Sequence, residues 1–229
     1  MDCLESATFP NQSESEKDRL LHMVVVGGGP TGVEYAGELR DFLIQDLSKW
    51  YPEVADRVRI TLIEALPNVL NSFSRKLIEY TEQVFAENKV DILNNTAVKE
   101  VKQKELTVKK KDGTLETIPY GLLVWAAGNA PRQITKDLIA QLPADLQKQR
   151  RGVTVDDHLL AQGADNIFVL GDASATKYAP TAQVASQQGK YIAHLLGDIG
   201  VQTAAGRVWD KQSATPFNYA HWGSLAYPS

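Results

Sequence analysis

Cysteine is nearly absent from this sequence: Cys3 is the single one among 229 residues. One thiol excludes a disulfide framework, a four-cysteine zinc site and a CxxC redox pair within the chain. A surplus of positive charge is absent too, since 24 Lys and Arg stand against 28 Asp and Glu and the formal net charge is −4. Proteins that bind polyanions normally carry a basic surplus, so we expect no nucleic acid among the partners.

Long hydrophobic runs are also missing. The densest apolar stretches, residues 23–26 and 122–127, fall far short of the ~18 residues that a membrane span needs. Residues 1–17 mix acids, serine and proline without a basic region followed by an apolar one, so they predict neither a signal peptide nor an Arg-rich transit peptide. What is present is ordinary for a globular protein, with 43% hydrophobic and 23% charged residues.

The first strong pattern is a strand followed by a glycine turn and a helix. Residues 22–26 form an apolar run rich in valine, which predicts a strand buried on both faces. Apolar residues then recur at spacings of three and four from Val33 to Leu47, which predicts an amphipathic helix that ends before Pro52. Residues 59–64 predict a second buried strand.

The rest of the chain continues this alternation of strands and helices. A helix is predicted over residues 74–88, and short strands are predicted over 90–93, 98–102, 106–110 and 122–125, with an Asp-Gly turn at 111–114. A polar, helical connection containing the basic residues 148–151 follows, then strands over 152–155 and 167–170 and a helix over 181–196. The order predicts an α/β fold in which an antiparallel piece is inserted into a βαβ unit.

The turn after the first strand carries the spacing Gly27-x-Gly29-x-x-Gly32. The first glycine permits the tight turn, the second lets the backbone approach a pyrophosphate, and the third lets helix and strand pack closely. The amides and dipole at the helix start then meet the phosphates. A plain glycine-rich turn is the alternative, but the strand, the helix and a later acid together favour a dinucleotide site. The candidate cofactor-binding residues are Gly27, Gly28, Gly29, Pro30, Thr31 and Gly32.

The later acid is Glu64, at the carboxyl end of the second strand. A carboxylate there can accept hydrogen bonds from the adenosine ribose and repels a 2′-phosphate. It follows Gly27 by 37 residues rather than the usual ~20, and the insertion at 44–57 accounts for the excess. Residues 65–74 contain no Lys or Arg, so NADH is favoured over NADPH. The alternative is an ordinary surface acid at a strand end.

Six motifs in a fixed order carry a family resemblance. They are VVVGGGPTGVE at 24–34, LIEALP at 62–67, IPYG at 118–121, VWAAG at 124–128, IFVLGD at 167–172 and PTAQVA at 180–185. In these motifs the chain resembles the mitochondrial alternative (type II) NADH:ubiquinone oxidoreductases, particularly the fungal ones. The likeness runs from residue 3 to about 196 and resumes weakly over 216–227.

The resemblance implies an α/β, Rossmann-like flavoprotein with two dinucleotide-binding domains. In such an enzyme FAD takes hydride from NADH and passes two electrons to ubiquinone, without pumping protons, at the surface of the mitochondrial inner membrane; a homodimer is possible in this family. The implied domains are residues 1–21 as a linker from a missing part of the FAD domain, 22–128 as the NADH domain, and 129–229 as the second part of the FAD domain. The family's first FAD-binding unit and its C-terminal membrane-binding region find no counterpart here, so we interpret the chain as an internal piece.

The resemblance also implies roles for residues of the NADH domain. Glu34 matches a glutamate close to the nicotinamide and the quinone, whereas the residues alone suggest only an acid that interacts favourably with the helix dipole. Ala127 and Gly128 match an Ala-Thr-Gly motif where the chain crosses between domains. Ala127 replaces the usual threonine, so a hydroxyl contact is lost there.

Further roles are implied on the flavin side. Gly171-Asp172 matches the segment whose aspartate bonds the flavin ribityl chain, with a simple strand-end turn as the alternative. Ala182, Gln183 and Gln187 match a quinone-associated pattern. The two glutamines are four residues apart and share one helical face, so both amides are expected to face flavin and quinone, unless they are merely exposed.

Three functions follow from this reading. The first is the enzyme just described, with Glu34, Gln183 and Gln187 as its catalytic candidates. The second is a catalytically silent NADH-binding fragment of such an enzyme. The third, a pyridine-nucleotide-disulfide oxidoreductase, needs a cysteine pair that this chain lacks. The four histidines show no ligand spacing, so no metal site is predicted.

Overall fold

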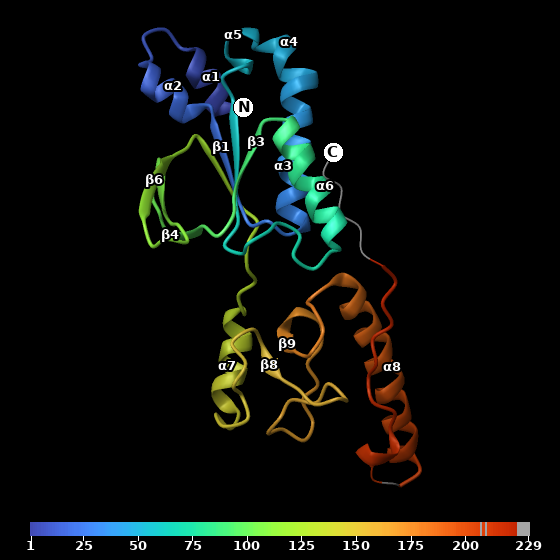
Figure 1. Ribbon diagram of the computed structural model, residues 1–229. Helices are drawn as coiled ribbons and strands as arrows, with labels where there is room; N and C mark the ends of the chain where they lie inside the picture. Colours follow the sequence, from blue (N-terminus) through green and yellow to red (C-terminus); the bar gives the residue numbers. More distant parts are fainter. Residues whose placement is uncertain (207, 209, 224–229) are drawn as a thin grey trace. The chain divides into compact units, whose positions relative to one another are not determined.

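The computed structural model describes residues 1–206, 208 and 210–223. These residues form two compact units, residues 1–128 (unit 1) and residues 129–223 (unit 2), and each is described by itself (Figure 1).

Unit 1 is built on a parallel sheet with the strand order β3-β2-β1-β7. The strands are β1 (His22–Val26), β2 (Arg59–Ile63), β3 (Val90–Leu93) and β7 (Leu122–Trp125), and all three pairings are parallel. Every residue of β1 is buried, as its unbroken apolar run predicted. The predicted α/β, Rossmann-like fold is confirmed.

The two faces of this sheet are covered differently. Helices α3 (Pro30–Phe42) and α6 (Arg75–Glu87) lie on one face, where Val25 packs in a cluster with Val33 and Phe85. An antiparallel sheet of β4 (Ala97–Val101), β5 (Glu105–Lys109) and β6 (Leu115–Pro119) covers the other face, on the left in Figure 1. There Val24 and Val26 pack with Val108, so successive residues of β1 serve opposite layers.

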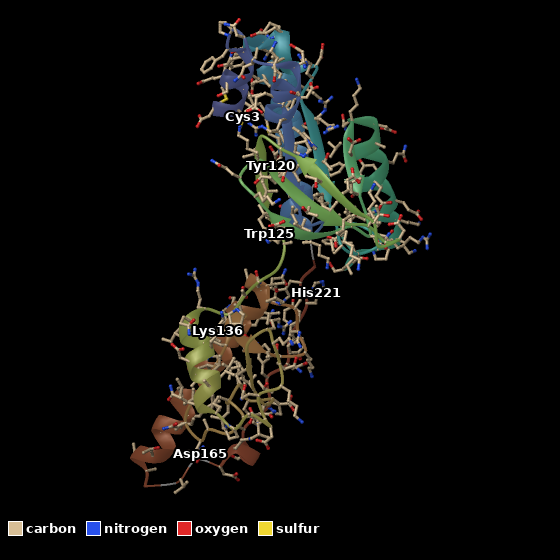
Figure 2. All side chains as sticks on the ribbon, turned by 90° about the vertical axis from the view of Figure 1, so that its left-hand side faces the viewer. Cys3, Tyr120, Trp125, Lys136, Asp165 and His221 are labelled. Atoms are coloured by element: carbon tan, nitrogen blue, oxygen red, sulfur yellow. The ribbon has the colours of Figure 1, made fainter. Side chains whose placement is uncertain are left out.

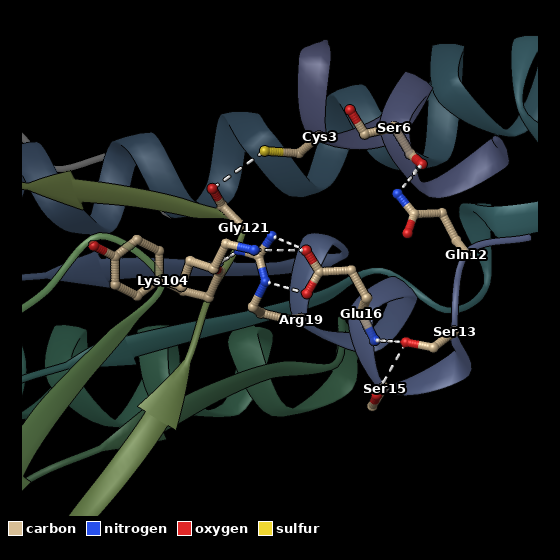
Figure 3. A network of polar contacts seen from close by, with 10 residues as sticks. Cys3, Ser6, Gln12, Ser13, Ser15, Glu16, Arg19, Lys104 and Gly121 are labelled. Carbon is tan, nitrogen blue, oxygen red and sulfur yellow. Dashed lines mark hydrogen bonds and ion pairs between the residues drawn. The ribbon is translucent and has the colours of Figure 1, made fainter.

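The first 21 residues, expected to be a linker, contain two short helices. They form α1 (Asp2–Thr8) and α2 (Glu14–Leu20), because Leu4 and Leu20 bury their side chains in the same core cluster as β1. Polar contacts add to this packing (Figure 3): the Cys3 thiol donates to the carbonyl of Gly121, and Arg19 donates to the carbonyl of Tyr120. Arg19 also bonds Glu16 and lowers the pKa of that carboxyl to about 2.

The helix after the glycine turn is less regular than predicted. After α3 the chain makes a π-helical turn, η1 (Leu43–Leu47), and short helices α4 (Ser48–Trp50) and α5 (Pro52–Ala55). Tyr51 leaves the helical region, with φ −133° and ψ 56°, because Pro52 disfavours that region for the residue before it. The predicted end before Pro52 is therefore confirmed.

Unit 2 contains less regular structure. Its elements are α7 (Gln133–Gln141), β8 (Val153–Thr154), the 3₁₀ turn η2 (Gly171–Ala173), β9 (Ser174–Ala175), α8 (Ala182–Ala204) and the 3₁₀ turn η3 (Lys211–Ser213). Strands β8 and β9 pair in parallel over two residues. Among the described residues, none of the helices has both the length and the apolarity of a membrane span.

Three predictions for unit 2 need correction. Residues 167–170 are not a strand: they make one isolated antiparallel bridge, between Phe168 and Leu160. The partner segment is short, because turns at 157–158 and 162–163 lie on either side of it. Residues 148–151 are not helical, since α7 ends at Gln141 and Leu142 is extended before Pro143. Helix α8 continues to Ala204, eight residues beyond the predicted end, across two glycines.

Candidate functional site

Two glycines of the turn between β1 and α3 are required by close backbone contacts. Gly27 has φ +114°, and a Cβ there would lie 2.8 Å from the carbonyl carbon of Ala126. A Cβ on Gly32 would lie 1.8 Å from the carbonyl oxygen of Gly27. Gly29 differs, because a Cβ there would meet no atom of the chain within 4 Å. The backbone at Gly29 therefore faces open space, as a pyrophosphate site requires.

Gly28 is held by the segment that follows β2. Its N–H donates to Glu64 Oε2 at 2.6 Å, and its carbonyl accepts from Leu70 N–H at 2.7 Å. A Cβ on Gly28 would lie 2.8 Å from Glu64 Oε2 and 3.0 Å from Val69 Cγ1. A side chain at this variable position of the fingerprint would press on Glu64 and on Val69 in the loop after β2. The spacing of the fingerprint alone does not reveal this.

Glu64 connects two parts of the chain. While Oε2 accepts from Gly28, Oε1 accepts from the N–H of Leu66 at 2.7 Å. The carboxylate is half-buried and stands directly after β2, at the carboxyl end of the parallel sheet. It is therefore built into the wall of the site rather than lying as a free surface acid.

A cavity of about 390 Å³ opens at this place. It is lined by Gly27, Gly28, Gly29, Pro30, Glu64, Leu66, Leu70, Asn71, Ser72, Ala126, Ala127 and Gly128. The structure thus brings together seven residues that the sequence predicted. Five lining residues were missed: Leu66, Leu70, Asn71, Ser72 and Ala126. For the first four the signal was available in the loop 65–74, which sequence reasoning searched only for cations.

The remaining predicted residues of unit 1 lie around this cavity rather than in its lining. Thr31 and Gly32 belong to the first turn of α3, and the half-buried Glu34 follows one turn later. Trp125, at the end of β7 (Figure 2), donates from Nε1 to the carbonyl of Ala127 at 2.6 Å and so fixes the chain before Gly128, where φ is +72°.

In unit 2 the predicted Gly171-Asp172 segment is a clamped turn. Gly171 has φ +64°; its N–H donates to Gln188 Oε1 at 2.6 Å and its carbonyl accepts from Ser174 Oγ at 2.8 Å. The side chain of Asp172 is exposed on this turn. Gln188 is fully buried on α8, and its Nε2 has no hydrogen-bond partner among the described residues. Sequence reasoning missed Gln188, whose signal was a third glutamine beside Gln187.

The predicted glutamines of α8 hold a segment that we call the strap, residues 214–223. Gln187 accepts from the N–H of Ala220 at 2.9 Å and donates to its carbonyl at 2.7 Å. Gln183 accepts from Tyr219 OH at 2.9 Å and donates to the carbonyl of Gly223 at 2.8 Å. Both amides are thus engaged by the strap, which lies outside the predicted elements, while Ala182 is exposed in the first turn of α8.

Comparison with known families shows where these features belong. The profile described as pyridine nucleotide-disulphide oxidoreductase matches residues 1–189. The chain belongs to this family. The glycine turn, the parallel sheet and the acid at the end of β2 agree with this assignment.

Several known proteins resemble this chain in sequence. It is 46% identical to the external alternative NADH-ubiquinone oxidoreductase of Yarrowia lipolytica, over 99% of this chain and 45% of that protein. It is 41% identical to the external NADH-ubiquinone oxidoreductase 2 of Saccharomyces cerevisiae, over 97% of this chain and 44% of that protein. Both relatives are named mitochondrial. The chain spans about half the length of the curated relatives it matches.

Solved structures share the fold. The structure of NDH2 from Plasmodium falciparum in complex with NADH matches with a TM-score of 0.85, over 99% of this chain and 59% of that chain. At 23% identity this likeness concerns the fold alone.

Proposed function

We propose that this chain is the NADH domain and the second part of the FAD domain of a type II NADH:ubiquinone oxidoreductase, which pumps no protons. The observation that carries the proposal is the cavity at the glycine turn, where open backbone and a strand-end carboxylate lie together. The names of the Yarrowia and Saccharomyces relatives support the donor and the acceptor. In this proposal residues 22–128 bind NADH, residues 1–21 connect to them from the FAD domain, and residues 129–229 belong to the flavin side.

Unit 1 recognises NADH through its backbone and one carboxylate. The open space at Gly29 and the first turn of α3 receive the pyrophosphate, because unpaired amides and the helix dipole favour an anion there. Glu64 accepts two backbone N–H groups and still has lone pairs for the adenosine ribose hydroxyls. Since a 2′-phosphate would meet this carboxylate without a cation in the loop 65–74, NADH is preferred over NADPH.

Unit 2 offers groups that fit a flavin dinucleotide. The clamped turn presents the exposed carboxylate of Asp172 as an acceptor for a ribityl hydroxyl, and the buried Nε2 of Gln188 beside it is a donor without a partner in the described chain. The dipole at the start of α8 favours negative charge nearby. FAD, when bound, supplies the acceptor for hydride from NADH and the donor of two electrons to ubiquinone.

Three residues are proposed to act toward nicotinamide and quinone. Glu34 lies beyond the glycine turn on α3 and is assigned to the region of the nicotinamide and the quinone. Gln183 and Gln187 are assigned to the acceptor side of α8. Because their amides bond the strap in the structure, contact with ubiquinone requires them to exchange these hydrogen bonds.

The names of the relatives support a proposal for where the protein acts. Their names place them in mitochondria, and we propose the same organelle for this protein, at the surface of the inner membrane and with a homodimer as its assembly. The membrane surface and the homodimer rest on the resemblance in sequence.

The visible spectrum of the purified chain tests the flavin part of the proposal. Oxidised flavin absorbs near ~450 nm, so a flavoprotein is yellow, and NADH added without oxygen should bleach it until ubiquinone restores the colour. A colourless chain that binds NADH supports the second candidate, an NADH-binding fragment without catalysis. The observation that favours this candidate is that the glycine fingerprint occurs once, at Gly27 to Gly32. A chain that binds neither flavin nor NADH contradicts both.

A further inference from the structure

Three side chains of unit 2 form a continuous chain of hydrogen bonds at the strap. The Tyr219 hydroxyl lies 2.9 Å from Gln183 Oε1 and 3.0 Å from His221 Nδ1. His221 (Figure 2) is exposed, whereas Tyr219 is half-buried. The chain therefore begins at an imidazole ring in contact with water and ends at an amide of α8.

The amide of Gln183 fixes the direction of these hydrogen bonds. Its Oε1 also accepts from Trp222 N–H at 3.2 Å, and its Nε2 donates to the carbonyl of Gly223 at 2.8 Å, so the oxygen is the atom that faces Tyr219. An amide oxygen only accepts, so Tyr219 donates its single proton to Gln183. The Tyr219 oxygen must then accept from His221, which places the proton of the ring on Nδ1.

Aromatic packing holds the Tyr219 hydroxyl in this position. The rings of Tyr219 and Tyr178 meet edge to face at 5.5 Å, and the N–H of Tyr219 donates to Tyr178 OH at 3.3 Å. Tyr178 packs edge to face on Phe217, which is buried and donates its N–H to the carbonyl of Asp157 at 2.8 Å. The hydroxyl is thus oriented by the fold itself.

We propose that His221 and Tyr219 form a relay that carries a proton from water to ubiquinone. This inference rests on the proposed function, in which Gln183 lies on the acceptor side. A quinone oxygen is a hydrogen-bond acceptor, as Gln183 Oε1 is, so it can replace that oxygen as the partner of Tyr219. The relay residues are not among the candidates that the sequence provided.

The relay supplies a proton that the reaction needs. Reduction of ubiquinone to ubiquinol takes two electrons and two protons, and the hydride of NADH accounts for both electrons and one proton. For the other, the Tyr219 O–H bond breaks as an O–H bond forms on the quinone oxygen. His221 passes its Nδ1 proton to the Tyr219 oxygen while Nε2 takes a proton from water. Because the ring is exposed, exchange with water then restores the proton on Nδ1.

The first test needs no turnover. Nitrogen NMR of the purified 229-residue chain, at a pH where the ring is neutral, should show His221 as the Nδ1–H tautomer. Tyr219→Phe removes the acceptor that keeps the proton there, so the His221 signals should move toward the Nε2–H tautomer. An Nε2–H ring in the parent chain, or signals that Tyr219→Phe leaves unchanged, overturns the relay.

The second test compares two electron acceptors on the chain loaded with FAD. Decylubiquinone needs protons, whereas ferricyanide takes electrons alone. Tyr219→Phe and His221→Asn, which keeps an N–H near the place of Nδ1, should reduce decylubiquinone about tenfold more slowly than the parent. Both should reduce ferricyanide at the parent's rate. His194→Asn is the matched control, since His194 is an exposed histidine of α8, and it should change neither rate.

The outcomes separate the relay from the proposed function. Unchanged rates with decylubiquinone, or equal slowing with both acceptors, refute the relay and leave the function standing, because equal slowing shows a general disturbance of unit 2. If the parent chain takes up no FAD, the flavin part of the proposed function fails, and the relay fails with it.

Discussion

Replacing Glu64 tests whether one carboxylate joins the glycine turn to the loop after β2. The structure gives it two short hydrogen bonds from backbone N–H groups, 2.6 Å to Gly28 and 2.7 Å to Leu66. Hydrogen bonds to a charged acceptor contribute roughly 1.5–3 kcal/mol each. Leu66 is exposed, so its N–H can bond water instead. Gly28 is buried, so most of the lost stability comes from its unsatisfied N–H. We therefore expect Glu64→Ala to lower the free energy of unfolding by about 2–4 kcal/mol, and Glu64→Gln, which keeps one acceptor oxygen, by about 1–2 kcal/mol.

Urea denaturation followed by circular dichroism measures this free energy, and amide hydrogen exchange at Gly28 reports the bond itself. Exchange at Gly28 should be faster in Glu64→Ala than in the parent chain, in the absence of any nucleotide. Glu79→Ala is a suitable control, because that exposed acid on α6 pairs with the exposed Arg75, and its loss is expected to change the free energy of unfolding by less than about 0.5 kcal/mol. Unchanged exchange at Gly28 together with unchanged unfolding in Glu64→Ala would refute the joining role.

Three further predictions concern other parts of the chain. Gly28→Ala should lower the free energy of unfolding by about 1–3 kcal/mol, because its Cβ would lie within 3.0 Å of Glu64 and Val69. Gly29→Ala should leave the free energy of unfolding unchanged and weaken the binding of NADH, because a Cβ there meets open space. Equal stability of the two variants in urea would contradict this. Burial, and then the charge of Arg59, lower the pKa of His22 from its ordinary value of 6.5. The neutral ring is therefore favoured in the folded state. The stability that it contributes to the fold is present above pH 6.5 and is lost as the pH falls below that value. The urea midpoint of His22→Gln should therefore fall less between about pH 7.5 and 5.5 than the midpoint of the parent chain. A parallel fall in both proteins counts against it. Gln187→Leu should speed amide exchange at Ala220 by removing both of its bonds to the strap, while the exposed neighbour Ser186→Ala should not, and equal rates would show that the strap is held elsewhere.

The strap changes how the two predicted glutamines are understood. Their spacing of four residues indicates a shared face of α8, and the structure places both on that face. What they contact there is the hydroxyl of Tyr219 and the backbone of Ala220, Trp222 and Gly223. This segment has no helical or strand periodicity. A side-chain amide carries both a donor and an acceptor, so one glutamine can satisfy both polar groups of Ala220. Pattern alone offers no way to foresee such a partner 33 residues away.

The clearest successes of sequence reasoning are the elements with strong periodicity. β1, β2 and β3 begin and end within one residue of their predicted bounds, because apolar runs between glycines and charges define a buried strand. Prediction failed where the structure of a segment depends on the segment that packs against it. Residues 167–170 have the composition of a strand but lack a partner of equal length.

By itself, the sequence determined the parallel α/β core of unit 1, the glycine turn, the acid after β2 and the family resemblance, since local spacing and composition encode these features. Only the tertiary structure decided that a side chain at position 28 would press on Glu64 and Val69, that Glu64 holds Leu66 at the cavity, and that Gln183 and Gln187 bond the strap. The physical reason is the same in each case. Hydrogen bonds and close contacts between distant segments depend on how the chain packs, and the position of a residue in the sequence carries no record of the atom that will face it.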